Sequence, residues 1–158
     1  MAKIEITDLQ DHIPLERKLI LQIFRLAMKE EGRAARSLSV VLTDNRHIRD
    51  LSREYLGHDA HTDVLSFPLE DVDWPAMAAN GGVNGEIIAS AEMALQQAKA
   101  RNIDPRAELL LYLVHGLLHL IGYDDRTPGE AQRMHQREDE LLDHCGFGNV
   151  YTGHPGIQ

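Results

Sequence analysis

The sequence has a single cysteine, no excess of glycine or proline and no long hydrophobic run, and each shortage excludes a class of protein. Cys145 is the only cysteine in 158 residues, so neither an internal disulfide nor a four-cysteine zinc site can form. A reducing compartment such as the bacterial cytoplasm is therefore expected. With 12 glycines and 6 prolines, the chain is neither collagen-like nor a low-complexity polymer.

Long apolar segments and positive charge are also scarce. The longest uncharged, mostly apolar run, residues 109–121, is too short to cross a bilayer, and the first residues do not resemble a secretory signal. We expect a protein that is neither inserted in a membrane nor exported. Sixteen Lys and Arg against 25 Asp and Glu give a formal net charge of −9. This charge argues against a general nucleic-acid coat protein, although it leaves room for a local basic face.

The length and the hydrophobic pattern predict one α+β domain over residues 1–158. Segments 3–9, 38–42, 62–69 and 85–89 have the pattern of strands, and residues 71–84 that of an irregular loop. Helices are predicted at about 14–31, 45–56, 91–101, 105–121 and 128–144, with Ser90, Asp104 and Thr127 as candidate caps. The expected architecture is a mixed sheet of roughly four strands packed with about five helices.

The segment 109–125, LLLYLVHGLLHLIGYDD, carries the chemistry. Its leucines point in nearly every direction around a helix, so the helix should be buried on all sides. His115 and His119 lie four residues apart and therefore share one face. Gly122 can end the helix, and the turn after it could return Asp125 to the same point. Two imidazoles and one carboxylate leave a coordination place open, as catalytic metal sites do, which indicates hydrolysis.

Other interpretations of these residues stay open. A bare pair of histidines at this spacing is more often part of a core, and Asp124 competes with Asp125 as the ligand or could act as a base. Position 116, where an HExxH protease has its glutamate, is glycine, which argues against that protease class. Glu108 is either a partner of His115 or an acid that compensates the helix dipole.

The blocks HTDVLSFP (61–68), GEIIAS (85–90) and HGLLHLIGYD (115–124), with the helix 130–142, closely resemble the YbeY family of bacterial metal-dependent endoribonucleases. The resemblance implies one zinc ion, cleavage of single-stranded RNA by a metal-activated water, and a role in ribosomal RNA maturation. It also implies small-subunit rRNA precursors as substrate, contact with the small ribosomal subunit and a part in ribosome quality control. His115 and His119 match two family ligands, and Asp125 occupies the place of a third histidine.

The sequence departs from the family pattern at two places. A carboxylate at position 125 keeps the site suited to a divalent ion but could change the metal, and iron enzymes also use two histidines and one carboxylate. Leu56 stands where many members have an arginine that acts near the RNA phosphate. Arg53 or His58 could take over that role. Arg46, Arg49 and Arg53 would form one helical stripe, which suits an RNA backbone or an ordinary solvated face.

We therefore expect a zinc-dependent endoribonuclease in which His115, His119 and Asp125 bind the metal. One alternative is a ribosome-assembly factor whose metal only stabilises the fold. Another is a different metal-dependent hydrolase or iron enzyme on the same scaffold. The remaining histidines fit no ligand spacing with the main pair and are interpreted as surface residues: His12, His47, His61, His135, His144 and His154.

Overall fold

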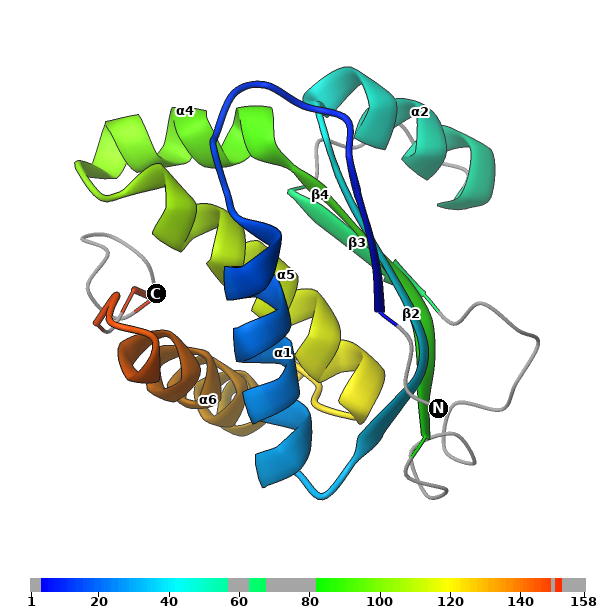
Figure 1. Ribbon diagram of the computed structural model, residues 1–158, viewed down its shortest axis with the longest axis vertical. Helices are drawn as coiled ribbons and strands as arrows, with labels where there is room; N and C mark the ends of the chain where they lie inside the picture. Colours follow the sequence, from blue (N-terminus) through cyan, green and yellow to red (C-terminus); the bar gives the residue numbers. More distant parts are fainter. Residues whose placement is uncertain (1–3, 57–62, 68–81, 149, 152–158) are drawn as a thin grey trace.

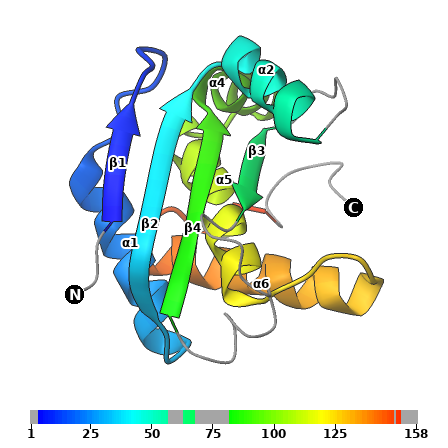
Figure 2. The ribbon, with the colours of Figure 1, turned by 90° about the vertical axis from the view of Figure 1, so that its right-hand side faces the viewer.

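A computed structural model describes residues 4–56, 63–67, 82–148 and 150–151 of the chain. Its centre is a four-stranded mixed sheet in the order β1-β2-β4-β3. The strands are β1 (Ile4–Asp8), β2 (Ala34–Thr43), β3 (Val64–Phe67) and β4 (Gly82–Ser90). β2 runs parallel to both β1 and β4, and β3 pairs antiparallel with β4 at one edge (Figure 2). The predicted α+β class and mixed sheet are confirmed.

Helices cover both faces of this sheet. The helices are α1 (Arg17–Glu30), α2 (Asn45–Leu56), α4 (Ala91–Arg101), α5 (Pro105–Ile121) and α6 (Pro128–His144). α1, α5 and α6 lie on one side, where the main core forms, and α2 lies on the other (Figure 1). Ile48 of α2 packs there with Leu65 and Ile88 in a second, smaller core. All five predicted helices are present among the described residues, none of them long and apolar enough for a bilayer span.

α5 is buried on almost every side, as its leucine-rich pattern predicts. Two glycines let it approach the sheet closely. A Cβ on Gly116 would lie 2.8 Å from Ile87 Cγ2, and one on Gly85 would lie 2.6 Å from Leu120 Cδ2. The absence of these two side chains therefore sets the distance between α5 and β4, and with it the position of the histidines on α5.

Some predicted boundaries need correction. The interpretation of residues 71–84 as a loop is wrong for residues 82–84, which begin β4, while residues 71–81 lie outside the described part. β2 begins at Ala34 rather than Leu38, because its first half also pairs with the early part of β4, with a register shift between Ala35 and Ser37. Long-range pairing of this kind overrides local strand propensity.

Candidate metal centre and adjoining pocket

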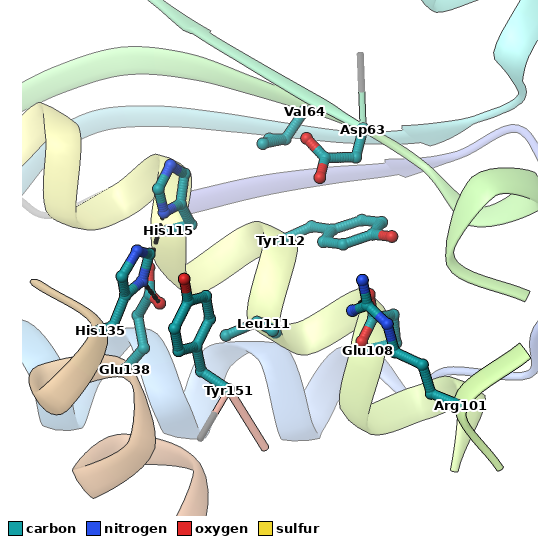
Figure 3. A pocket seen from close by; sticks show the side chains of 10 residues that line it. All are labelled: Asp63, Val64, Arg101, Glu108, Leu111, Tyr112, His115, His135, Glu138 and Tyr151. Atoms are coloured by element: carbon teal, nitrogen blue, oxygen red, sulfur yellow. Dashed lines mark hydrogen bonds and ion pairs between the residues drawn. The ribbon is translucent and has the colours of Figure 1, made fainter. Parts of the chain in front are cut away.

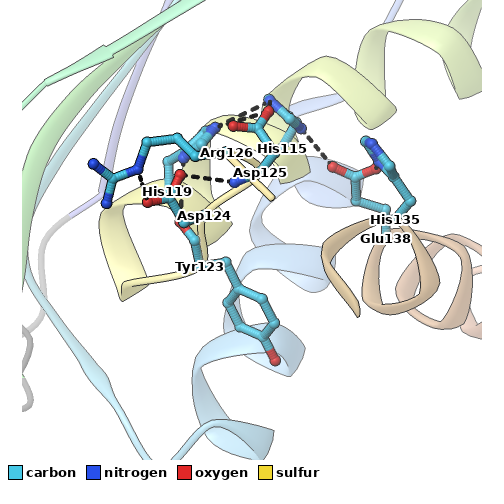
Figure 4. A network of polar contacts seen from close by, with 8 residues as sticks. All are labelled: His115, His119, Tyr123, Asp124, Asp125, Arg126, His135 and Glu138. Atoms are coloured by element: carbon cyan, nitrogen blue, oxygen red, sulfur yellow. Dashed lines mark hydrogen bonds and ion pairs between the residues drawn. The ribbon is translucent and has the colours of Figure 1, made fainter. Parts of the chain in front are cut away.

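The end of α5 brings the three predicted metal ligands together. Gly122 has a φ of +125°, and its N–H donates to the carbonyl of His119. The N–H of Tyr123 donates to the carbonyl of Leu118 at 2.9 Å, which completes a Schellman cap. This cap reverses the chain, so that the carboxylate of Asp125 returns to the face that carries the two histidines (Figure 4).

The ligand atoms form a compact triangle. His115 Nε2 lies 3.2 Å from His119 Nε2, and Asp125 Oδ2 lies 3.7 Å from the first and 3.8 Å from the second. The point in their common plane that is equidistant from the three atoms is about 2.1 Å from each, the usual length of Zn–N and Zn–O bonds. The three residues therefore fit a divalent ion, and they leave positions for further ligands.

The hydrogen bonds made by Nδ1 of each imidazole explain why the two Nε2 atoms face each other. His115 Nδ1 lies 2.6 Å from the carboxylate of Glu138, and His119 Nδ1 lies 3.2 Å from the carbonyl of Tyr123. Both partners accept hydrogen bonds, so each Nδ1 carries the proton and donates. In the neutral rings, both Nε2 atoms then direct lone pairs at each other and at the Asp125 carboxylate. A cation placed among the three atoms would offset their mutual repulsion.

Helix α6 supplies two residues of the site that the sequence interpretation missed. Glu138 has a side chain only 1% exposed, and it accepts from His115 with one oxygen and from His135 at 2.7 Å with the other. His135, expected at the surface, is a half-buried member of this chain. The three residues could form a second metal cluster. Their 2.6 and 2.7 Å contacts, however, are hydrogen-bond lengths and too short for neighbouring ligands of a tetrahedral ion.

The charges around the histidines favour a bound cation. Burial lowers the pKa of His115, but the hydrogen bond and charge of Glu138 and the charge of Asp125 outweigh it and raise the pKa overall. Burial and the neighbouring His115 lower the pKa of His119. Burial would raise the pKa of Glu138, yet its hydrogen bonds from His115 and His135 hold it below the usual value. Glu138 is thus an ionised carboxylate that holds the candidate ligand His115 by a hydrogen bond to Nδ1.

Asp124 shapes the turn beside the metal cluster. Its carboxylate accepts from the backbone N–H of Asp125 at 2.8 Å and from the Arg126 guanidinium at 2.5 Å. These contacts lower the pKa of Asp124 although desolvation opposes them. Through the first of these contacts, Asp124 positions the backbone of Asp125. The predicted role of Asp124 as a base stays a prediction.

The predicted arginine stripe lies in another part of the molecule. Arg46, Arg49 and Arg53 line one depression along α2, together with Asp50 and Glu92. Since α2 and α5 cover opposite faces of the sheet, the arginine stripe and the two histidines of the metal cluster lie on opposite sides of it. His58, the other candidate for the role of the family arginine, lies outside the described residues.

Ser90 and Glu108 have defined surroundings. The Ser90 hydroxyl accepts from the backbone N–H of Met93, which confirms it as the cap of α4. Glu108 is buried on α5, forms an ion pair with Arg101 at 3.7 Å, and lines a pocket next to His115. It touches the pocket rather than the metal cluster.

Comparison with known proteins assigns the family. The family model described as Endoribonuclease YbeY matches residues 4–146. The chain belongs to the YbeY family. A relative from Carboxydothermus hydrogenoformans is 39% identical over 146 residues, covering 90% of this chain and 97% of the relative. One from Salinibacter ruber is 36% identical, covering 81% and 82% of the two chains. Both are described as Endoribonuclease YbeY.

The fold is shared with a solved structure. A solution structure of a Thermotoga maritima protein superposes with a TM-score of 0.63 at 26% identity, covering 90% of this chain and 89% of that one. The family-model match over residues 4–146 confirms the resemblance to YbeY proteins inferred from the HGLLHLIGYD block.

Proposed function

We propose that the protein is a zinc-dependent endoribonuclease that hydrolyses phosphodiester bonds in single-stranded RNA. One observation carries this proposal: Nε2 of His115, Nε2 of His119 and Oδ2 of Asp125 converge on a point at metal-ligand distance from all three. Membership of a family described as endoribonuclease supplies the substrate class.

Each residue of the site has a separate task in this proposal. His115, His119 and Asp125 would hold the ion, which would polarise a phosphoryl oxygen and lower the pKa of a bound water. Glu138 and the carbonyl of Tyr123 keep both Nδ1 atoms protonated, so that both Nε2 atoms stay available as ligands. Asp124 holds the backbone of residue 125 in the turn.

The arginines of α2 would contribute affinity for the RNA backbone. Arg46 and Arg53 are exposed and Arg49 is half-buried along the same depression. α2 and α5 both contact the edge strand β3. An RNA strand that reached from the arginines to the histidines would therefore pass over the β3 edge of the sheet.

We further propose, from the YbeY relationship, that the biological substrate is precursor ribosomal RNA. Processing at the 3′ end of small-subunit rRNA, contact with the small subunit, ribosome quality control and a cytoplasmic location belong to this proposal. Leu56 stands where the resemblance implies an arginine near the phosphate, and the candidates to take over that role are Arg53, one turn earlier on α2, and His58.

Metal depletion and replacement test the proposal. Chelated protein should lose cleavage of a single-stranded RNA oligonucleotide and regain it with stoichiometric zinc, and His115→Ala should stay inactive at every zinc concentration. Cleavage that survives chelation, or persists in His115→Ala, would refute the proposal. Zinc binding and ribosome association without cleavage would instead favour a non-catalytic assembly factor. Elemental analysis showing iron instead of zinc would favour a different metalloenzyme.

A further inference from the structure

A pocket next to the metal cluster has no task in the hydrolysis described above. It has a volume of about 260 Å³ and lies between α5, α6, the end of α4 and the residues that enter β3 (Figure 3). His115 belongs to both sites: its Nε2 faces the metal cluster, and its ring forms part of the pocket lining. Any group in this pocket therefore sits directly beside the reaction centre.

The pocket has flat and apolar walls. The ring of Tyr151 stacks on His135 with centroids 3.6 Å apart and planes 6° apart, and the His135 ring lies nearly parallel to that of His115, with centroids 6.1 Å apart. Leu111 and Tyr112 of α5 add buried apolar surface. Aromatic and aliphatic walls of this kind suit a planar, weakly polar group, and base–aromatic stacking is the usual way in which proteins hold unpaired nucleotides.

The charged groups of the pocket disfavour phosphate as its occupant. Asp63 and Glu108 both contribute carboxyl groups to the lining, and Arg101 is paired with Glu108. Carboxyl groups repel a phosphate, whereas they accept hydrogen bonds from the ring and amino N–H groups of a base.

We propose that this pocket binds one unpaired nucleobase of the RNA, from a nucleotide that flanks the bond cleaved at the metal cluster. The inference rests on the proposed function. It explains in physical terms why a duplex would be a poor substrate: a base that is paired and stacked between its neighbours cannot enter a pocket between α5 and α6.

Abasic substitution of the substrate tests the pocket without altering the protein. A single-stranded RNA oligonucleotide is cleaved by the zinc-loaded protein, the cleaved bond is mapped, and an abasic nucleotide is then placed at each flanking position in turn. An abasic nucleotide at one flanking position should lower kcat/KM by about tenfold, within the range expected for loss of one stacked base. Abasic nucleotides at more distant positions should have little effect. A scan with no sensitive flanking position overturns the proposal.

Two matched variants assign the effect to the pocket. Tyr151→Leu removes an aromatic ring from the pocket lining, so the variant should cleave the intact oligonucleotide with a kcat/KM about tenfold lower than the wild type. It should cleave the abasic oligonucleotide as the wild type does. Phe147→Leu removes a ring outside the pocket lining, where it faces Arg106, and should retain the full abasic penalty. If Tyr151→Leu retains that penalty too, the proposal is overturned.

Failure of the proposed function gives a different result. In that case the wild type does not cleave the intact RNA at all, and fluorescence anisotropy then measures binding of the intact and abasic oligonucleotides to the zinc-loaded protein. Tighter binding of the intact strand, lost in Tyr151→Leu, would still support the base pocket. Equal dissociation constants would overturn it.

Discussion

Replacing Glu138 by glutamine should weaken metal binding without unfolding the protein. Glu138 accepts hydrogen bonds from His115 and His135 at 2.6 and 2.7 Å. A glutamine has one carbonyl oxygen, so it can accept from one imidazole only, and its NH2 group must face the other. If the NH2 group faces His115, Nδ1 of that ring must accept and Nε2 must carry the proton, which removes a metal ligand. If the carbonyl faces His115, the ligand survives but loses the charge behind it.

The expected size of the effect follows from these two arrangements. Loss of a partner behind a metal ligand commonly lowers metal affinity by about 10- to 100-fold, or about 1.4–2.7 kcal/mol. Glutamine has nearly the volume of glutamate, so the melting temperature of the metal-free protein should change little. Glu138→Ala should lower both the metal affinity and the melting temperature of the metal-free protein. It also leaves buried imidazole N–H groups unpaired, at a cost of about 1–3 kcal/mol.

Competition against a chromophoric zinc chelator measures the affinity, and thermal unfolding of the metal-free protein measures the stability. Glu140→Gln is the matched control, since Glu140 lies on the same helix, is half exposed and pairs with Arg137. The control should bind zinc as the wild type does. A dissociation constant for Glu138→Gln within about twofold of the wild-type value would refute the argument that this carboxylate supports the His115 ligand.

Zinc at about 100 times its dissociation constant should stabilise the wild type by about 2.7 kcal/mol in thermal unfolding, and His119→Ala should show no such gain. Burial raises the pKa of Glu108, so the folded state keeps its proton to higher pH than the unfolded chain, and stability should fall as pH rises above about 4.5. Glu108→Gln should flatten this dependence in urea titrations at several pH values, and an unchanged slope would contradict the shift. Arg46→Ala should reduce the slope of log K against log salt for RNA binding by about 0.7, whereas an unchanged slope would place the arginine outside the RNA contact. Gly116→Ala should lower stability by about 1–3 kcal/mol because its Cβ would lie 2.8 Å from Ile87, and a melting temperature at or above the wild-type value would contradict this packing.

The sequence was sufficient for the features that depend on local spacing. The interval between His115 and His119 places both rings on one helical face, and Gly122 stops the helix with the left-handed φ that glycine tolerates. These two facts locate Asp125 without knowledge of the rest of the fold. The capping residues Ser90, Asp104 and Thr127 were identifiable for the same reason, since a cap acts within three residues of its own position.

Glu138 and His135 were missed because their role depends on the contact between α5 and α6. A signal was nevertheless present in the sequence: Glu138 continues the apolar stripe of Met134 and Leu141 at helical spacing, and these two residues are buried. An acid in the middle of an apolar stripe must be paired in the core, because an unpaired buried charge is too costly. What the stripe could not reveal is the partner, which lies 23 residues away on another helix.

The pocket was unpredictable for a further reason: its lining residues come from five separate segments of the chain. His115 links the two sites, because the ring that offers Nε2 to the metal cluster also presents Nδ1 to Glu138 and a face toward His135. A base bound in the pocket would contact the His115 ring, the same ring whose Nε2 atom would bind the metal. Base recognition and metal geometry should therefore be energetically coupled, so that RNA binding is tighter with zinc present and zinc binding is tighter with RNA present by the same factor.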